Sequence, residues 1–158
     1  MNFKPFEDGL SAYPAESIVF VGLGNPMRSD DGAGLILLQT IKQAKHFQDA
    51  HYIEAGSNPE NYLQAILDLH PKAVVFIDTA EFNQPPGTIQ WLSKTDLDQI
   101  RISTHAFSMT LVEDYIRAHQ TVDFHYLGIQ PESTALGSEI STIVQKKLDQ
   151  FLVNSGTD

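Results

Sequence analysis

Three polar residues far apart in the sequence have the types that a metal site needs. Asp31 follows an apolar run and a glycine-containing loop, Asp78 follows another apolar run, and His105 precedes an expected helix. Two carboxylate oxygens and one imidazole nitrogen suit a divalent cation of intermediate hardness and leave coordination positions open for a partner's ligands. Each residue alone also fits an ordinary turn or helix cap, so the prediction depends on their convergence.

Other catalytic chemistries have less support in these residues. The chain has no cysteine, which excludes thiol nucleophiles, thiolate metal sites and disulfides. No serine lies in a Gly-x-Ser-x-Gly segment, and the histidines do not form a His-Glu-x-x-His motif. An aspartic dyad of Asp31 and Asp78 stays open as an alternative. Asp30, beside Asp31, is a candidate for the group that activates water.

The glycines after the first apolar run do not make a nucleotide site. Gly22-x-Gly24 begins like a dinucleotide-binding fingerprint, but Met27 stands where the third glycine belongs and Pro26 interrupts the turn. The acidic pair that follows would repel a pyrophosphate. We interpret both glycines as permitting a tight turn after a buried strand, and we expect no organic cofactor.

Strands and helices must position these side chains, and segments typical of each alternate along the chain. Apolar runs of strand length occupy 17–23, 51–55, 73–77, 88–92 and 123–129, and amphipathic segments of helical length occupy 32–46, 59–70, 106–118 and 138–152. This order predicts an α/β fold, a three-layer α/β/α sandwich with a mostly parallel central sheet. The carboxyl ends of such strands share one edge, where ligands bind, so Asp31, Asp78 and His105 are expected to meet there.

Length and composition fit one domain. The 158 residues are 42% apolar and 19% charged, enough apolar side chain for a single core. We expect a flexible leader over 1–16, which carries several charges, one domain over 17–153 and a tail over 154–158.

Charge and hydropathy restrict the partners. Ten Lys and Arg against twenty Asp and Glu give a net charge of −10, which excludes a sequence-independent grip on nucleic acid. No window has the roughly 20 apolar residues that a membrane-spanning helix needs, and no signal peptide is evident. We therefore expect a cytoplasmic protein without a membrane partner, and a monomer that docks transiently on its partner.

Five segments, in chain order, resemble the nickel-iron hydrogenase maturation endopeptidases, which remove a C-terminal extension from the hydrogenase large subunit. The segments are 22–34, 56–61, 76–80 with 86–87, 103–105 and 127–131. Their form is most similar to the subgroup that serves hydrogenase 3, the hydrogenase of the formate hydrogenlyase type. The likeness spans nearly the whole predicted domain.

The resemblance implies that Asp31, Asp78 and His105 are the nickel-binding and catalytic residues. It implies that the partner is the large-subunit precursor and that nickel arrives with this substrate, held by the precursor's own cysteines. We hypothesise that the trio docks on that nickel and that the metal positions the scissile bond or polarises its carbonyl or a water. Loops at 56–60 and 130–132 are expected at the edge that reads the precursor.

Two alternatives stay open on the sequence. A nickel sensor or scaffold could use the same trio without cutting its partner. A peptidyl-tRNA-hydrolase-like enzyme would share the segment 21–26, but the stretch 28–32 lacks the Thr-Arg-His-Asn type of sequence that carries the catalytic histidine of those enzymes. The net charge of −10 also opposes tRNA binding.

Overall fold

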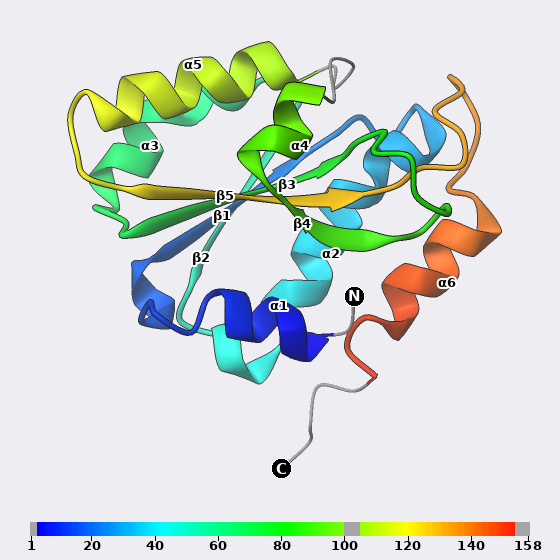
Figure 1. Ribbon diagram of the computed structural model, residues 1–158, viewed down its shortest axis with the longest axis horizontal. Coiled ribbons are helices and arrows are strands. Elements are labelled where there is room, and N and C mark those ends of the chain that lie inside the picture. The colour runs from blue at the N-terminus through cyan, green and yellow to red at the C-terminus, as the bar shows by residue number, and fades with distance from the viewer. Residues whose placement is uncertain (1–2, 100–104, 154–158) are drawn as a thin grey trace.

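A five-stranded sheet forms the centre of the computed structural model, which describes residues 3–99 and 105–153 (Figure 1). The strands are β1 Ile18–Leu23, β2 His51–Gly56, β3 Ala73–Thr79, β4 Ile89–Leu92 and β5 Asp123–Ile129. They lie in the order β2-β1-β3-β5-β4, and only the edge strand β4 is antiparallel to its neighbour. The predicted mostly parallel sheet is confirmed.

Helices cover both faces of this sheet. They are α1 Phe3–Gly9, α2 Ala33–Lys42, α3 Leu63–Asp68, α4 Lys94–Gln99, α5 Ala106–Arg117 and α6 Thr142–Gln150. Figure 1 shows α3 and α5 on one face and α1, α2 and α6 on the other. Ile18 and Phe20 of β1 pack with the second group, whereas Val19 and Val21 pack with the first. Both faces of the central strands are therefore buried, which accounts for their unbroken apolar runs.

The order of the strands places a topological switch point between β1 and β3. From β1 the chain passes through α2 to β2 on one side of the sheet, and from β3 it continues to β4 and β5 on the other side. The loops that leave β1 and β3 therefore diverge at their carboxyl ends. Such a switch point is the usual ligand site of an open α/β sheet.

The expected flexible leader over 1–16 is wrong for its described part. Phe3 and Phe6 of α1, with Leu10 just after it, are buried in the core, and the Phe6 ring stacks on Trp91. The charges that suggested a leader lie on the other side of α1, where Lys4 pairs with Asp8 across one turn. The spacing 3, 6, 10 is a helical apolar pattern and was the signal for this helix.

The sequence prediction also omitted α4. Its start is a capping box: Asp96 accepts hydrogen bonds from the backbone N–H and the hydroxyl of Ser93, whose Oγ accepts the Asp96 N–H in return. Other predicted helices are confirmed with shorter bounds, and helical turns at Ser29–Gly32 and Pro59–Tyr62 precede α2 and α3. The predicted tail 154–158 lies outside the described residues.

Within the described ranges, no helix combines the length and the apolar character required to cross a membrane.

Candidate metal centre and adjoining cleft

The fold brings Asp31, Asp78 and His105 together. One ligand atom of each lies within 4.8 Å of those of the other two. All three residues are buried, with 7%, 5% and 4% of their surfaces exposed, respectively. Asp31 lies in the turn before α2, Asp78 in the last part of β3, and His105 directly before α5. Their neighbour Thr104, which belongs to the same sequence segment as His105, lies outside the described residues.

Asp78 and His105 form the closest pair of the trio. The Nδ1 atom of His105 lies 3.1 Å from Oδ2 and 3.3 Å from Oδ1 of Asp78. This hydrogen bond is the largest influence on the ring and raises the pKa of His105, although burial opposes it. The negative charges of Asp78, Asp31 and Glu60 raise the pKa further. The pocket therefore favours a positive charge among its carboxylates.

Close backbone packing positions the loop that carries Asp31. The Asn25 N–H donates to Oδ2 of Asp31 over 2.9 Å. Gly24 has a φ of +134°, and a Cβ there would lie 1.9 Å from the carbonyl oxygen of Asp31. The interpretation of Gly24 as a turn residue is confirmed, whereas Gly22 lies inside β1, where a Cβ would meet the Leu38 side chain at 2.9 Å.

The carboxylate of Asp30 is occupied by hydrogen bonds from nearby loops, which does not suit a group that activates water. It is completely buried, and its Oδ2 accepts hydrogen bonds from the Glu132 and Ser133 N–H groups and from the Ser141 hydroxyl, while Oδ1 accepts the Ser141 N–H. Its backbone oxygen accepts the Thr79 hydroxyl at 2.7 Å, beside Asp78. The structure thus gives Asp30 a structural role, joining the loops around the centre, in place of the proposed catalytic one.

Glu60 is a nearby carboxylate that the sequence reasoning did not single out. It lies in the Pro59–Tyr62 turn that packs against α5, after β2. Its Oε2 atom is buried and has no hydrogen-bond partner among the described residues. Its position after an expected strand, like that of Asp31, was the signal that could have found it.

In the loop at 130–132, which was expected to contact the precursor, Gln130 has a structural role. Gln130 is buried, and its Oε1 accepts the N–H groups of Phe82 and Gln84. Its Nε2 donates to Glu81 at 2.7 Å. Gln130 therefore fixes the segment after β3. In the loop at 56–60, which was also expected to contact the precursor, Ser57 and Asn58 are exposed.

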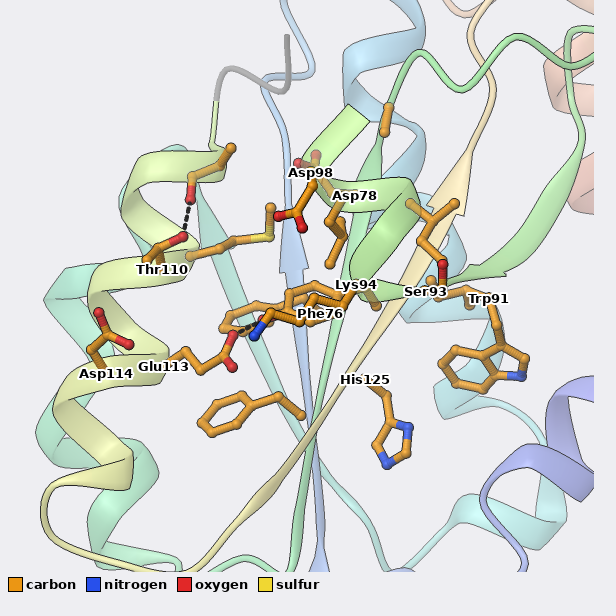
Figure 2. Close-up of a pocket in the computed structure, with 18 of the residues that line it drawn as sticks. Phe76, Asp78, Trp91, Ser93, Lys94, Asp98, Thr110, Glu113, Asp114 and His125 are labelled. Atoms are coloured by element: carbon orange, nitrogen blue, oxygen red, sulfur yellow. Dashed lines mark hydrogen bonds between the residues drawn. The ribbon is translucent and has the colours of Figure 1, made fainter. Parts of the chain in front are cut away.

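A cleft of about 720 Å³ adjoins the centre on the α5 face of the sheet. Figure 2 shows residues of α5, including Thr110, Glu113 and Asp114, along one wall, and Lys94 and Asp98 of α4 along the other. Strand β5 crosses its floor, and Asp78 contributes to its lining. The sequence reasoning missed this cleft because its far wall, α4, was not predicted.

One side-chain network organises the floor and wall of the cleft. The Tyr126 hydroxyl donates to Oε2 of Glu113, and Arg117 Nη2 lies 2.9 Å from Oε1 of the same carboxylate. Burial raises the pKa of Glu113, while the charges of Arg117 and Lys94 oppose that shift. The guanidinium group of Arg117 lies over the Phe124 ring, 5.2 Å from its centroid.

The donors of the centre fit a transition metal. Two carboxylates and an imidazole within 4.8 Å can converge on one cation, which would relieve the repulsion between the buried acids. The Asp31–Asp78 dyad considered on the sequence differs from this arrangement, because His105 contacts Asp78 directly. The set is short of a full coordination sphere, so it can share a metal with ligands from another molecule.

Comparison with known proteins agrees with the family resemblance found in the sequence. A family model described as hydrogenase maturation protease, HycI, matches residues 36–154. The hydrogenase 3 maturation protease of Escherichia coli K12 is 30% identical over 115 residues, which cover 72% of this chain and 72% of that protein. This relative agrees with the subgroup predicted from the sequence.

Solved structures show the same fold. The crystal structure of a NiFe hydrogenase maturation protease, HycI, from Thermococcus kodakarensis KOD1 has a TM-score of 0.77 and 28% identity, and the match covers 92% of each chain. The solution structure of the endopeptidase HycI from Escherichia coli has a TM-score of 0.71 and 25% identity, covering 84% of this chain and 85% of that one.

Proposed function

This chain belongs to the hydrogenase maturation protease family and is a peptidase, and from that premise we propose that it removes the C-terminal extension of a nickel-loaded NiFe hydrogenase large-subunit precursor. In this proposal Asp31, Asp78 and His105 dock on the nickel of the substrate. The observation that carries it is the convergence of these three buried side chains within 4.8 Å.

The donor types support a metal that is shared with the substrate. The chain has no cysteine, so its site offers carboxylate and imidazole ligands without a thiolate. Such a site binds nickel less tightly than one that adds soft sulfur ligands. A precursor that supplies thiolates would complete the coordination sphere, so only a nickel-loaded precursor would dock with full affinity.

Docking of this kind would also place the scissile bond. A metal held between two proteins fixes the position of both, and this replaces a random encounter by a defined orientation of the reacting groups. Nickel near the scissile carbonyl would act as a Lewis acid on its oxygen. Asp31, Asp78 and His105 would hold it there, and the buried surroundings would keep bulk water from weakening these electrostatic contacts.

Processing of the precursor tests the proposal. Nickel-loaded and nickel-free large-subunit precursor from the same cell would be mixed with the protein, and the shortened product would be measured by mass spectrometry. We expect cleavage only of the nickel-loaded form, and loss of cleavage in Asp78→Ala and His105→Ala. Asp149→Ala, on the exposed side of α6, is the matched control.

Three outcomes contradict the proposal. Equal processing of nickel-free precursor would remove nickel recognition, and full activity of both variants would remove the role of the trio. A stable complex with nickel-loaded precursor and no cut would favour a scaffold instead.

We also propose that the protein acts as a monomer and that it acts in the cytoplasm. Sedimentation of the free protein and of its mixture with precursor would measure the stoichiometry, for which we expect one copy of each.

A further inference from the structure

We infer that the cleft between α4 and α5 binds the C-terminal extension of the precursor, so that the segment to be removed lies on β5 while the retained part stays at the metal centre. This inference rests on the proposed function and specifies where the leaving peptide lies.

The cleft is continuous with the metal centre. Asp78 belongs to both, because its carboxylate contacts His105 and its residue also lines the cleft. Figure 2 shows Asp78 above the aromatic floor residue Phe76, both from β3. A chain that reaches the trio can therefore continue past Asp78 into the cleft.

The size and lining of the cleft suit a short peptide. Its volume of about 720 Å³ falls within the range of about 300–1,000 Å³ that is common for ligand pockets. Leu97, Phe124 and Tyr126 are partly exposed in the cleft and offer apolar surface to the side chains of an extended segment, and burying that surface stabilises the complex.

The rim offers polar partners for a peptide backbone. Lys94 and Asp98 stand on α4, and Glu113 and Asp114 stand on α5. Tyr126 and Arg117 hold the Glu113 carboxylate in place, so this acceptor needs little ordering when a peptide N–H approaches. Charges of both signs along an apolar floor match the alternating N–H groups, C=O groups and side chains of an extended chain.

The occupant is the extension because of what the precursor presents. The retained side of the cut carries the nickel ligands in the proposed function and is fixed by them at the trio. The extension begins beyond the scissile bond and is the part free to lie in a groove. While the bond is intact, tethering raises the effective concentration of the extension at the cleft. Cleavage ends the tether, so the same site releases the product.

Photocrosslinking locates the extension directly. Because the chain has no cysteine, Thr110→Cys provides one attachment point on the cleft wall for a benzophenone maleimide. Leu111→Cys, next to it on α5 and exposed outside the lining, is the matched control. With nickel-loaded precursor, we expect the label at 110 to form adducts on the extension, in several-fold higher yield than the label at 111.

A blocking variant gives a second, kinetic measurement. Thr110→Phe narrows the cleft at an exposed position, and circular dichroism would verify its fold. We expect its KM for nickel-loaded precursor to rise by about tenfold or more, equivalent to about 1.4 kcal/mol of binding, while Leu111→Phe keeps the wild-type KM. Nickel affinity measured without precursor should be unchanged in both variants.

The inference and the proposed function fail in different ways. Adducts of the label at 110 on the retained part of the precursor, or in no higher yield than at 111, would overturn the inference even if processing depends on nickel. A wild-type KM of Thr110→Phe would do the same. Nickel-independent cleavage, in contrast, would overturn the proposed function and leave the crosslinking pattern to be read by itself.

Discussion

The imidazole of His105 lies 3.1 Å from the carboxylate of Asp78, although 27 positions separate the two residues in the chain. The His105 ring also offers one nitrogen to the possible metal site that it forms with Asp78 and Asp31. Because a doubly protonated imidazole has no free lone pair, protonation of the His105 ring competes with its ligation of a metal cation. This competition gives the centre a measurable dependence on pH.

Nickel binding to the free protein should weaken as the pH falls. Asp78, above all through its hydrogen bond, raises the pKa of His105, so the ring keeps its proton to a higher pH than an ordinary histidine. A protonated ring cannot ligate, and binding should therefore release a proton and strengthen as the pH rises through this raised pKa. Calorimetry in buffers of different ionisation enthalpy would count the released protons.

The stability of the metal-free protein should respond with the opposite sign. Because the pKa of His105 is higher in the folded than in the unfolded state, the pair with Asp78 stabilises the fold fully below the unfolded pKa. That contribution is lost as the pH rises through the folded value. His119→Ala, at an exposed position, should keep both pH profiles, and a pH-independent nickel affinity between about pH 6 and 8 would contradict the proposed ligation by His105.

Replacing Asp30 should affect stability before it affects chemistry. Asp30→Ala would leave the N–H groups of Glu132, Ser133 and Ser141 without their buried acceptor, which we expect to cost on the order of 3 kcal/mol in urea unfolding. Asp30→Asn keeps the shape and one acceptor oxygen, and its loss should be smaller. An Asp30→Asn protein with wild-type stability and no activity would instead support a catalytic role for this residue.

Phe6 should contribute strongly to folding. Its ring is completely buried and packs against Phe20, Phe47, Trp91 and Phe151. Phe6→Ala should therefore lower the free energy of unfolding by about 3–5 kcal/mol. Lys4→Ala, on the exposed side of α1, should change it by less than about 0.5 kcal/mol. Similar values for the two variants would show that α1 is not part of the cooperative fold.

Gly34 should be required for the close approach of α2 to the candidate metal centre. A Cβ at this position would lie 2.4 Å from the carbonyl oxygen of Leu23 and 2.8 Å from that of Ile77, next to Asp78. Gly34→Ala should displace α2 from these strand ends, so that both stability and nickel affinity fall.

Substitution of Gly137 tests the cost of backbone strain without a steric contact, and so complements the substitution of Gly34. Gly137 has a φ of +81° and no atom within 4 Å of an added Cβ, so Gly137→Ala should cost only the left-handed backbone penalty of about 1–2 kcal/mol. Equal losses in Gly137→Ala and Gly34→Ala would contradict the packing explanation.

Local sequence was sufficient to predict the sheet and to select three side chains that meet at its edge. Strands buried on both faces need unbroken apolar runs, and the run before Asp78 therefore marks β3 within two residues of its observed end. The side-chain types of Asp31, Asp78 and His105 already favour a metal, because ligand chemistry belongs to each residue separately. The mostly parallel character of the sheet then follows from general rules for alternating strands and helices.

Only the tertiary structure decided which contacts each of two neighbouring residues makes. Asp30 and Asp31 are adjacent and chemically identical, yet one is bound by the 132–141 loop and the other faces His105 and Asp78. The cleft depends on α4 and α5 facing each other across β5. The burial of α1 depends on aromatic rings from four other parts of the chain, Phe20, Phe47, Trp91 and Phe151. These outcomes are set by contacts between distant segments, whose geometry no local pattern of residues contains.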